Sequence, residues 1–383
     1  MRRKEAESGA VTVAHLLDCY LSISEVFIYE LVRNLPTVRS IVVARQIANL
    51  DLFPFSPVHH TNGKGRIASL LERITGKPSN DILRAEKYLR REAPCLLHAH
   101  FGLLGVRAGD LAKRLGLPLV TSFYGVDASK QAVEPAHAEG FARLFSQGDL
   151  FLAEGGAMRE RLAHLGCPPE KIRIQHLGVD LARFSYHERK PPRAGEPLRV
   201  LFCGRFVEKK GLLDALHAVR LALDAGCRIH LRVVGDGPLR GEVERAIVEK
   251  TLAPHVELTG MLDHGAYALE LSRAHVMIQP SRTASDGDTE GGAPTALLEA
   301  QATGLPVIST THADIPEYVH DGRSGILVGE RDVSGLAWAL EEFKARPELL
   351  GEMGKEGRRH VEEYYDIRRE AGKLERIYEE VLP

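Results

Sequence analysis

The sequence predicts an α/β protein built from two doubly wound domains, and three observations support this. The chain has 383 residues, which is more than one hydrophobic core usually serves. Short apolar segments alternate with amphipathic segments, which is typical of parallel sheets covered by helices on both faces. The alternation stops at a polar, proline-rich stretch and then begins again, so we expect one sheet on each side of that stretch.

The first half of the chain contains five candidate strands with helical segments between them. We expect strands at Val11–Leu17, Val38–Ala44, Cys95–His100, Leu117–Ser122 and Asp149–Ala153, and helices at Ser24–Leu35, Asp81–Glu92 and Leu103–Leu115. Gly116 and Pro118 follow the last of these helices, and both residues are typical of a helix end. We therefore predict a first domain over residues 1–180.

A linker is expected at residues 181–197, because the segment His187–Pro197 is polar and contains three prolines. The alternation then restarts and predicts a second domain over residues 198–365. Its strands are expected at Arg199–Cys203, Ile229–Val234, Val256–Leu258, Val276–Gln279 and Val307–Ser309, and its helices at Leu212–Ala225, Leu239–Lys250, Gly265–Arg273 and Pro294–Ala302. A charged helix is expected at Arg368–Val381, and the pattern alone leaves its place in the fold open.

Composition narrows the possible functions. The 50 basic and 52 acidic side chains give a formal net charge of -2, so broad nucleic-acid binding is not expected. The five cysteines are scattered and form no CxxC pair, which indicates reduced thiols rather than a disulfide framework or a zinc site. No apolar stretch is long enough to span a bilayer, and residues 1–10 are followed by no apolar core of a secretory signal. We therefore expect a cytoplasmic protein with a frayed N-terminal tail.

The segment at residues 286–299 carries the strongest sign of a ligand site. Gly291 and Gly292 precede a helix expected to begin at Pro294, and free amides at a helix N-terminus suit an anion such as a diphosphate. Glu290 lies in the loop, whereas Glu299 lies inside the helix beside leucines, where a carboxylate needs partners such as ribose hydroxyls. An amphipathic surface helix after a flexible loop would give the same pattern.

Two further turns follow strands of the second domain. Arg205 and Lys210 lie at a strand–helix turn, where the helix dipole disfavours cations unless an anion lies between them. A solvated basic face is the alternative interpretation. Gly235 and Gly237 form a glycine turn that could hold a nucleotide, but the turn lacks the GxGxxG spacing of an NAD site. We interpret the DxD pattern at residues 286–288 as a polar turn rather than a metal site.

In the first domain, two polar segments follow the ends of neighbouring strands. His98 and His100 share one face of their strand, and ligands bind beyond the carboxyl ends of parallel strands. We therefore expect His100 to touch a substrate and His98 to pack in the core. A zinc site would need a third ligand nearby in the sequence, which is missing. The segment Thr121–Asp127 leaves the next strand, and a simple turn is its alternative interpretation.

Together these segments resemble the retaining GT-B glycosyltransferases of family 4, and within them the transferases of bacterial exopolysaccharide and colanic-acid biosynthesis. The resemblance covers nearly the whole chain. It is carried by Ser24-Glu25-x-Phe27-Ile28, His98-x-His100-Phe101-Gly102, Thr121–Asp127, Gly178-Val179-Asp180, Gly204–Gly211, Val234–Pro238, Asp286–Gly291, Leu298-Glu299-Ala300, Gly304–Val307, Ile315-Pro316-Glu317 and Asp321–Gly325. The order and spacing of these motifs are more specific than any one of them.

The resemblance implies two Rossmann-like domains that face each other across a cleft, with the helix at residues 366–383 packing back onto the first domain. It implies a donor site in which Arg205 and Lys210 bind the diphosphate, Glu299 the ribose and Glu290 the donor sugar. The other residues that it assigns are Gly235 and Gly237 at the nucleotide, Gly291, Gly292, Ala293 and Thr295 at the phosphates or sugar, His100 as a catalytic residue with Glu290, and Tyr124 and Asp127 on the acceptor side.

Two departures from the family pattern affect this assignment. Eight residues separate Glu290 from Glu299, whereas the family's acidic pair is separated by seven. Either a bulge at Gly291 and its neighbour absorbs the extra residue, or Asp288 takes the place of Glu290. Tyr124 stands where many members have a histidine, and a tyrosine is a poor proton carrier at neutral pH.

The resemblance implies transfer of a sugar, with retention, from a nucleotide-sugar to a glycan or lipid-linked acceptor, without a metal or other cofactor. Two other functions stay open: another GT-B enzyme, such as a sugar-nucleotide epimerase or a phosphorylase, and a non-catalytic sugar-nucleotide-binding scaffold. A peripheral membrane contact is a further hypothesis, in which Arg66, Leu70, Leu71 and Arg73 form a basic apolar patch, although a solvated helix gives the same pattern.

Overall fold

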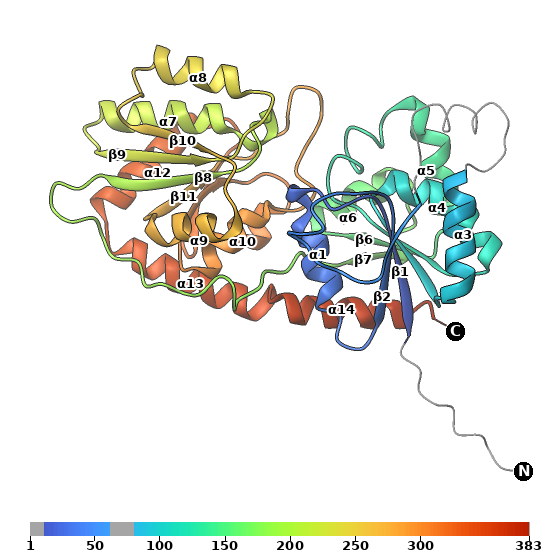
Figure 1. Ribbon diagram of the computed structural model, residues 1–383. Helices are drawn as coiled ribbons and strands as arrows, with labels where there is room; N and C mark the ends of the chain where they lie inside the picture. The colour runs from blue at the N-terminus through green and yellow to red at the C-terminus, as the bar shows by residue number, and fades with distance from the viewer. Residues whose placement is uncertain (1–10, 62–79, 383) are drawn as a thin grey trace, which may run out of the picture.

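The computed structural model describes residues 11–61 and 80–382, and these residues form two separate parallel sheets (Figure 1). The first sheet has the order β3-β2-β1-β4-β5-β6-β7 and the second the order β10-β9-β8-β11-β12-β13. The first consists of β1 (Thr12–Tyr20), β2 (Arg39–Ile47), β3 (Val58–His60), β4 (Leu96–His100), β5 (Leu119–Ser122), β6 (Leu150–Ala153) and β7 (Ile172–Ile174). The second consists of β8 (Leu198–Cys203), β9 (Ile229–Val234), β10 (Val256–Gly260), β11 (Val276–Gln279), β12 (Val307–Thr310) and β13 (Gly325–Val328).

Helices cover both faces of each sheet, as the apolar strands predict. One face of the first sheet packs against α3 (Asn80–Glu92), α4 (Gly102–Leu115), α5 (Pro135–Gln147) and α6 (Gly156–His164), and the other against α1 (Val26–Arg33) and α14 (Ile367–Glu379). The second sheet lies between α7 (Leu212–Asp224), α8 (Arg240–Glu249) and α12 (Val333–Ala345) on one face, and α9 (His264–Arg273), α10 (Thr295–Ala302), α11 (Ile315–Tyr318) and α13 (Leu349–Tyr364) on the other. The prediction of two doubly wound α/β units is confirmed.

The structure differs from the expected elements at the sheet edges and at one helix start, and it contains helices α5, α6, α11, α12 and α13, which were not predicted. The short strands β3, β7 and β13 were not predicted, and each is an edge strand that pairs on one side only. Edge strands carry a weaker apolar pattern because they are less buried than central strands. Pro294, predicted as the first helical residue, has an extended conformation (φ -56°, ψ 128°) and precedes α10, which begins at Thr295.

The helix α14 belongs to the first sheet in space, although it comes last in the chain (Figure 1). Its apolar residues Leu374 and Tyr378 pack in one cluster with Val13 of β1. The buried Glu375 carboxylate accepts hydrogen bonds from the amides of Thr37 (2.7 Å) and Val38 (2.8 Å). The chain therefore crosses between the sheets twice, which agrees with the family resemblance. The exact limits at residues 180, 197 and 365 stay a prediction.

The predicted linker is held firmly at one point. Arg189 is buried, and its guanidinium donates hydrogen bonds to backbone carbonyls around Leu271, Thr303 and Gly304 at 2.8 to 3.2 Å. Burial lowers the pKa of Arg189 to about 10. This residue anchors the crossing segment to the second sheet, so the polar composition of residues 187–197 does not mean that all of them are solvated.

Candidate active site in the cleft between the sheets

A cavity of about 480 Å³ lies between the carboxyl edges of the two sheets. Most of the predicted donor-binding residues line it, together with one predicted acceptor-side residue. The predicted residues in the lining are Arg205, Lys210, Gly235, Glu290, Gly291, Ala293, Thr295, Glu299 and Tyr124. Four predicted residues do not line it: His100, Asp127, Gly237 and Gly292. The cleft is where parallel sheets place ligand sites.

Lys210 and Glu290 form an ion pair inside this cavity. Lys210 Nζ lies 2.8 Å from Glu290 Oε1, and Ser281 Oγ donates to the same carboxylate at 2.9 Å. Burial raises the pKa of Glu290, but Lys210 and Lys209 more than offset it, so the net pKa is below its usual range. Glu290 is therefore charged at neutral pH, and its partner is a cation that an anionic ligand could attract.

The neighbouring lysine has a different partner and a different environment. Lys209 is buried, and its Nζ donates to Asp288 Oδ1 at 2.9 Å and to the carbonyl of Thr289 at 2.8 Å. Asp288 also lines the cavity, but its carboxylate is held by this lysine. Each of the two acids is thus paired with a lysine, and which of them faces a donor sugar stays a prediction.

Gly291 and Gly292 bring the two halves of the molecule into contact. A Cβ atom on Gly291 would lie 2.4 Å from the carbonyl carbon of Tyr124 and 2.5 Å from Glu154 Oε2. A Cβ on Gly292 would lie 2.7 Å from the Cβ of Glu154. No side chain fits at either position without a shift of its neighbours. Glu299 lies inside α10, and the placement of the extra residue at these two glycines stays a prediction.

Glu299 is the one predicted site residue whose pKa lies near neutrality. It lies on α10 and lines the cavity. Burial raises the pKa of Glu299 to about 7, and the Tyr267 hydroxyl and Arg183 partly offset this effect. A carboxyl group in this state can gain charge when hydroxyl donors arrive, which fits the predicted role at a ribose.

His100 does not line the cavity, and its contact with a substrate stays a prediction. His100 is fully buried and lies behind Tyr124, whose hydroxyl is 2.7 Å from His100 Nδ1. The side chains of His98 and His100 share the face of β4 that packs toward α14, so the strand pleat directs both into the core. Burial lowers the pKa of both histidines well below the usual value. Any effect of His100 on a ligand would act through Tyr124.

A third histidine completes this cluster. His15 of β1 places Nδ1 3.1 Å from His100 Nε2, and one nitrogen from each of His15, His98 and His100 lies within 4.8 Å of the others. Such a group could hold a metal ion. However, both nitrogens of His98 have partners at 2.7 Å, Ser122 Oγ and Tyr378 Oη. We therefore describe the cluster as a hydrogen-bonded network that supports Tyr124 from behind.

Asp127 and Gly237 do not line the cavity, but they fix the backbone of segments next to it. The buried Asp127 carboxylate accepts from the amides of Gly102 (2.8 Å) and Tyr124 (3.0 Å), so it fixes the start of α4 and the turn after β5. The Gly237 amide donates to its neighbour Asp236 at 2.7 Å. A Cβ on Gly237 would lie 2.7 Å from the backbone of Phe206. Both residues are of the type that the family resemblance requires, but the contacts that they make are with other residues of the protein and not with the cavity.

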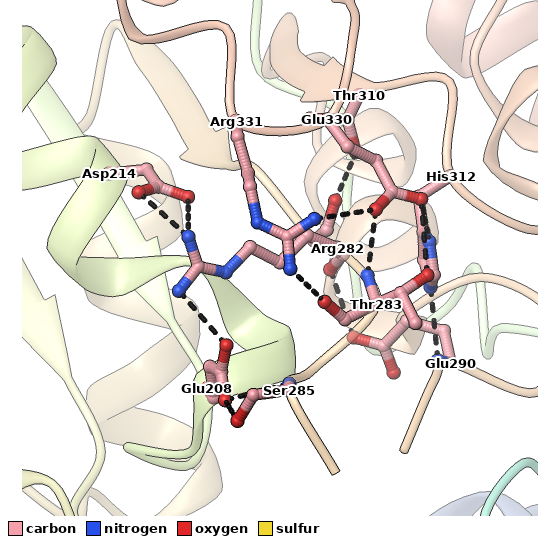
Figure 2. A network of polar contacts seen from close by, with 11 residues as sticks. Glu208, Asp214, Arg282, Thr283, Ser285, Glu290, Thr310, His312, Glu330 and Arg331 are labelled. Carbon is pink, nitrogen blue, oxygen red and sulfur yellow. Dashed lines mark hydrogen bonds and ion pairs between the residues drawn. The ribbon is translucent and has the colours of Figure 1, made fainter. Parts of the chain in front are cut away.

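A polar network holds the loop that carries Glu290 (Figure 2). The Glu290 amide donates to His312 Nε2 at 3.2 Å, and His312 Nδ1 lies 2.7 Å from Glu330. Arg282 donates to Asp214 at 2.8 Å, and Glu330 accepts from the amide of Thr283 at 2.9 Å. The supporting residues come from far along the chain, so no local motif predicted them.

Glu154 is an acidic lining residue that the sequence analysis did not predict. It directly follows β6, just as His100 ends β4 and Tyr124 follows β5, and it lines the cavity. Its position after a strand of the first sheet is the signal that could have found it. Phe27, Phe101 and Tyr124 form the adjacent wall, with ring centroids of the first two 4.9 Å from that of Tyr124.

The two parallel sheets and the cavity at their carboxyl edges define the class as a two-domain α/β protein with a candidate ligand site in the cleft. The chain matches two family models, one described as glycosyl transferases group 1 over residues 197–345 and one as glycosyltransferase family 4 over residues 24–183. It is 40% identical to WcaL of Salmonella typhimurium and 37% identical to WcaL of Escherichia coli K12, both named for colanic acid biosynthesis. The chain belongs to the family 4, group 1 glycosyltransferases.

These matches cover part of each protein. The Salmonella alignment spans 64% of this chain and 60% of the relative, and the Escherichia coli alignment spans 72% and 69%. Among solved structures, HepE of Anabaena in complex with UDP and glucose has a TM-score of 0.78 at 14% identity, covering 96% of this chain and 99% of HepE. Sucrose-phosphate synthase from Thermosynechococcus elongatus has a TM-score of 0.76 at 19% identity, covering 97% and 98%. The fold is GT-B.

Proposed function

We propose that this protein transfers a sugar from a nucleotide-diphosphate sugar to a glycan or lipid-linked acceptor, with retention at the anomeric carbon. The observation that supports this most is the Lys210–Glu290 ion pair beside Gly291 in the cleft. A bound diphosphate would compete for Lys210, which frees the Glu290 carboxylate to accept a hydrogen bond from a sugar hydroxyl. Donor binding would thus rearrange a pair that already exists in the free protein.

The leaving diphosphate would be stabilised by groups at the second sheet. Arg205 and Lys210 would supply positive charge, and amides from Gly291 to Thr295 would supply hydrogen-bond donors. The bond from the anomeric carbon to the phosphate oxygen breaks, and a bond to the acceptor oxygen forms on the same face. The acceptor proton passes to the leaving phosphate. Because side chains and amides supply the charge, we propose a reaction that needs no metal ion.

The relatives suggest where this activity is used. The names of the two WcaL proteins refer to colanic acid biosynthesis, and AmsK of Erwinia amylovora, 36% identical, is named for amylovoran biosynthesis. We propose a role in exopolysaccharide assembly, and the UDP in the HepE complexes makes a uridine nucleotide the first donor to test.

We propose a cytoplasmic location with peripheral contact at the membrane that carries a lipid-linked acceptor. None of the helices in residues 11–61 and 80–382 combines the length and the hydropathy needed to span a bilayer. The predicted basic apolar patch at Arg66, Leu70, Leu71 and Arg73 lies outside the described residues. Sedimentation with anionic liposomes would test the contact, and recovery of all protein in the supernatant would contradict it.

The first experiment is a thermal-shift screen of the purified protein with UDP, GDP, ADP and their sugar conjugates in the presence of EDTA. We expect stabilisation by one nucleotide family, because a ligand at 100 times its Kd stabilises the folded state by about 2.7 kcal/mol. Arg205→Ala should lose this shift, whereas the exposed Arg245→Ala should keep it. No shift with any nucleotide at millimolar concentration would contradict the donor site. NMR of the product linkage then tests retention.

A further inference from the structure

Glu154 has the position of a ligand-binding residue but no assigned role. Its side chain is 5% exposed and lines the cavity from the first sheet. Its backbone carbonyl is fixed from both halves of the molecule, by His176 Nδ1 at 2.6 Å and by Tyr318 Oη at 3.2 Å. The backbone at Glu154 is therefore fixed, and the buried side chain has little access to solvent.

The carboxyl of Glu154 lies against the loop that carries Glu290, Gly291 and Gly292, here called the donor loop, and not against the outer rim of the cleft. A Cβ on Gly291 would approach Glu154 Oε2 to 2.5 Å, and a Cβ on Gly292 would approach the same oxygen to 2.9 Å. These glycines occupy the stretch where this chain has one residue more than the family spacing. The donor loop and the carboxyl group of Glu154, which comes from the opposite sheet, thus meet at one place.

The surroundings of this carboxyl group favour its protonated form. Burial raises the pKa of Glu154 well above its usual value, and the nearby carboxylates of Asp127, Asp314 and Glu290 raise it further, while the Gly292 amide lowers it. A neutral carboxylic acid has one hydroxyl donor and one carbonyl acceptor. It is thus suited to a hydroxyl group, which also donates and accepts, and the surrounding carboxylates disfavour a phosphate at the same point.

We propose that Glu154 is a sugar-recognition residue whose carboxyl group forms a hydrogen bond with a hydroxyl of the donor's sugar ring. The inference rests on the proposed function and extends it to the side of the sugar that faces the first sheet. Glu290 would contact the sugar from the donor loop as a charged acceptor, and Glu154 would contact it from the opposite sheet as a donor. The two carboxyl groups would then select for hydroxyls by complementary hydrogen bonds.

The test uses two substitutions of Glu154 and one control in the full chain. Glu154→Gln keeps the shape and a hydrogen-bond donor, whereas Glu154→Leu keeps the approximate volume and removes both polar atoms. Glu160→Leu, on the exposed side of α6, is the matched control. Calorimetric Kd values are measured for UDP, GDP and ADP and for UDP-glucose, UDP-galactose, GDP-mannose and ADP-glucose.

We expect Glu154→Leu to weaken the binding of the nucleotide-sugar about tenfold while the Kd of the matching nucleoside diphosphate stays unchanged. Glu154→Gln should remain within about threefold of the wild type, and the control should match the wild type. Equal Kd values in all variants would overturn the inference, and so would a Glu154→Gln variant as weak as Glu154→Leu, because donation by a neutral group would then not matter. Circular dichroism checks the fold of each variant. Absence of nucleotide binding by the wild type would instead refute the donor site itself.

Discussion

The two sheets end at the same cleft, yet their carboxyl edges have opposite electrostatic character. The edge of the second sheet holds Lys209 and Lys210, each paired with a charged acid, and a loop of glycines before α10. The edge of the first sheet holds His100, Tyr124 and Glu154. Burial lowers the pKa of His100 and raises the pKa of Tyr124 and of Glu154, which favours the uncharged form of each. The two edges therefore offer different kinds of contact to a ligand in the cleft: one suits an anion and the other suits uncharged hydroxyl groups.

The largest effect is expected when Lys209 and Lys210 are substituted one at a time. Both lie at the edge of the second sheet, here called the charged edge. Lys210→Ala should lower kcat/KM by about 100-fold to 1,000-fold, because a cation aimed at the leaving group contributes that much. Lys209→Ala should act on stability, since it leaves the Asp288 carboxylate without its partner. Initial rates and thermal melts of both variants test this. Equal kinetic losses at equal melting temperature would show that the distinction between the two lysines is wrong.

The next effect concerns the point where the edges touch. Gly291→Ala should reduce turnover about 100-fold, because the new methyl group would displace Tyr124 and Glu154 and disturb the positions of the reacting groups. Binding of the nucleoside diphosphate alone should change much less. Gly241→Ala on α8 is the control, since a Cβ there meets no atom within 4 Å. An active Gly291→Ala variant would mean that the sheets do not meet this closely during the reaction.

A smaller effect is expected from substitutions at the edge of the first sheet, here called the neutral edge. If His100 acts through Tyr124, then His100→Gln and Tyr124→Phe should each lower kcat by about tenfold, and the double variant should lose little more. The hydrogen bond of 2.7 Å between the two side chains is the reason for this coupling. Steady-state kinetics of the three variants form a double-mutant cycle. Fully additive losses would indicate that His100 contacts a substrate directly.

The smallest effect is a pH dependence at Glu299. Because burial raises the pKa of Glu299 to about 7, the carboxyl group gains its charge between about pH 6 and pH 8, and the charged form accepts ribose hydroxyls better. Nucleotide affinity of the wild type should rise a few-fold across this window relative to Glu299→Gln. The stability of the free protein should depend on pH in the opposite direction to nucleotide affinity. The contribution of Glu299 to the free energy of unfolding is complete below its ordinary pKa of 4.5 and is lost as the pH rises through about 7. Calorimetry at pH 6, 7 and 8 tests both.

The charged edge was largely predictable from the sequence. Turns that contain glycine and proline can be recognised in the sequence, and they mark the ends of strands. Such turns lie close to Lys210, Glu290 and Glu299. Strand order in a doubly wound sheet then brings these turns to one cleft. The Asp288 alternative could not be decided in this way, because the choice depends on which lysine holds which acid across 79 or 80 positions of the chain.

The neutral edge was predicted less well, for a physical reason. His100 lies at the end of the right strand, but its direction depends on the pleat of β4 and on which face α14 covers. Tyr378, which contacts His98, comes 280 positions later in the chain, so no local pattern reports it. Glu154 was overlooked because a single acid after a short strand has no motif around it, and its burial depends on the opposite sheet.

The return of α14 to the first sheet has a consequence for synthesis on the ribosome. The strands of that sheet are made first, but the face that carries Val13 and Leu96 is covered only in part, by α1, until α14 has emerged. Until then this apolar face is available to chaperones or to another nascent chain. The second sheet, by contrast, can collect all of its strands and covering helices from one continuous segment, so the half synthesised later is positioned to finish folding earlier.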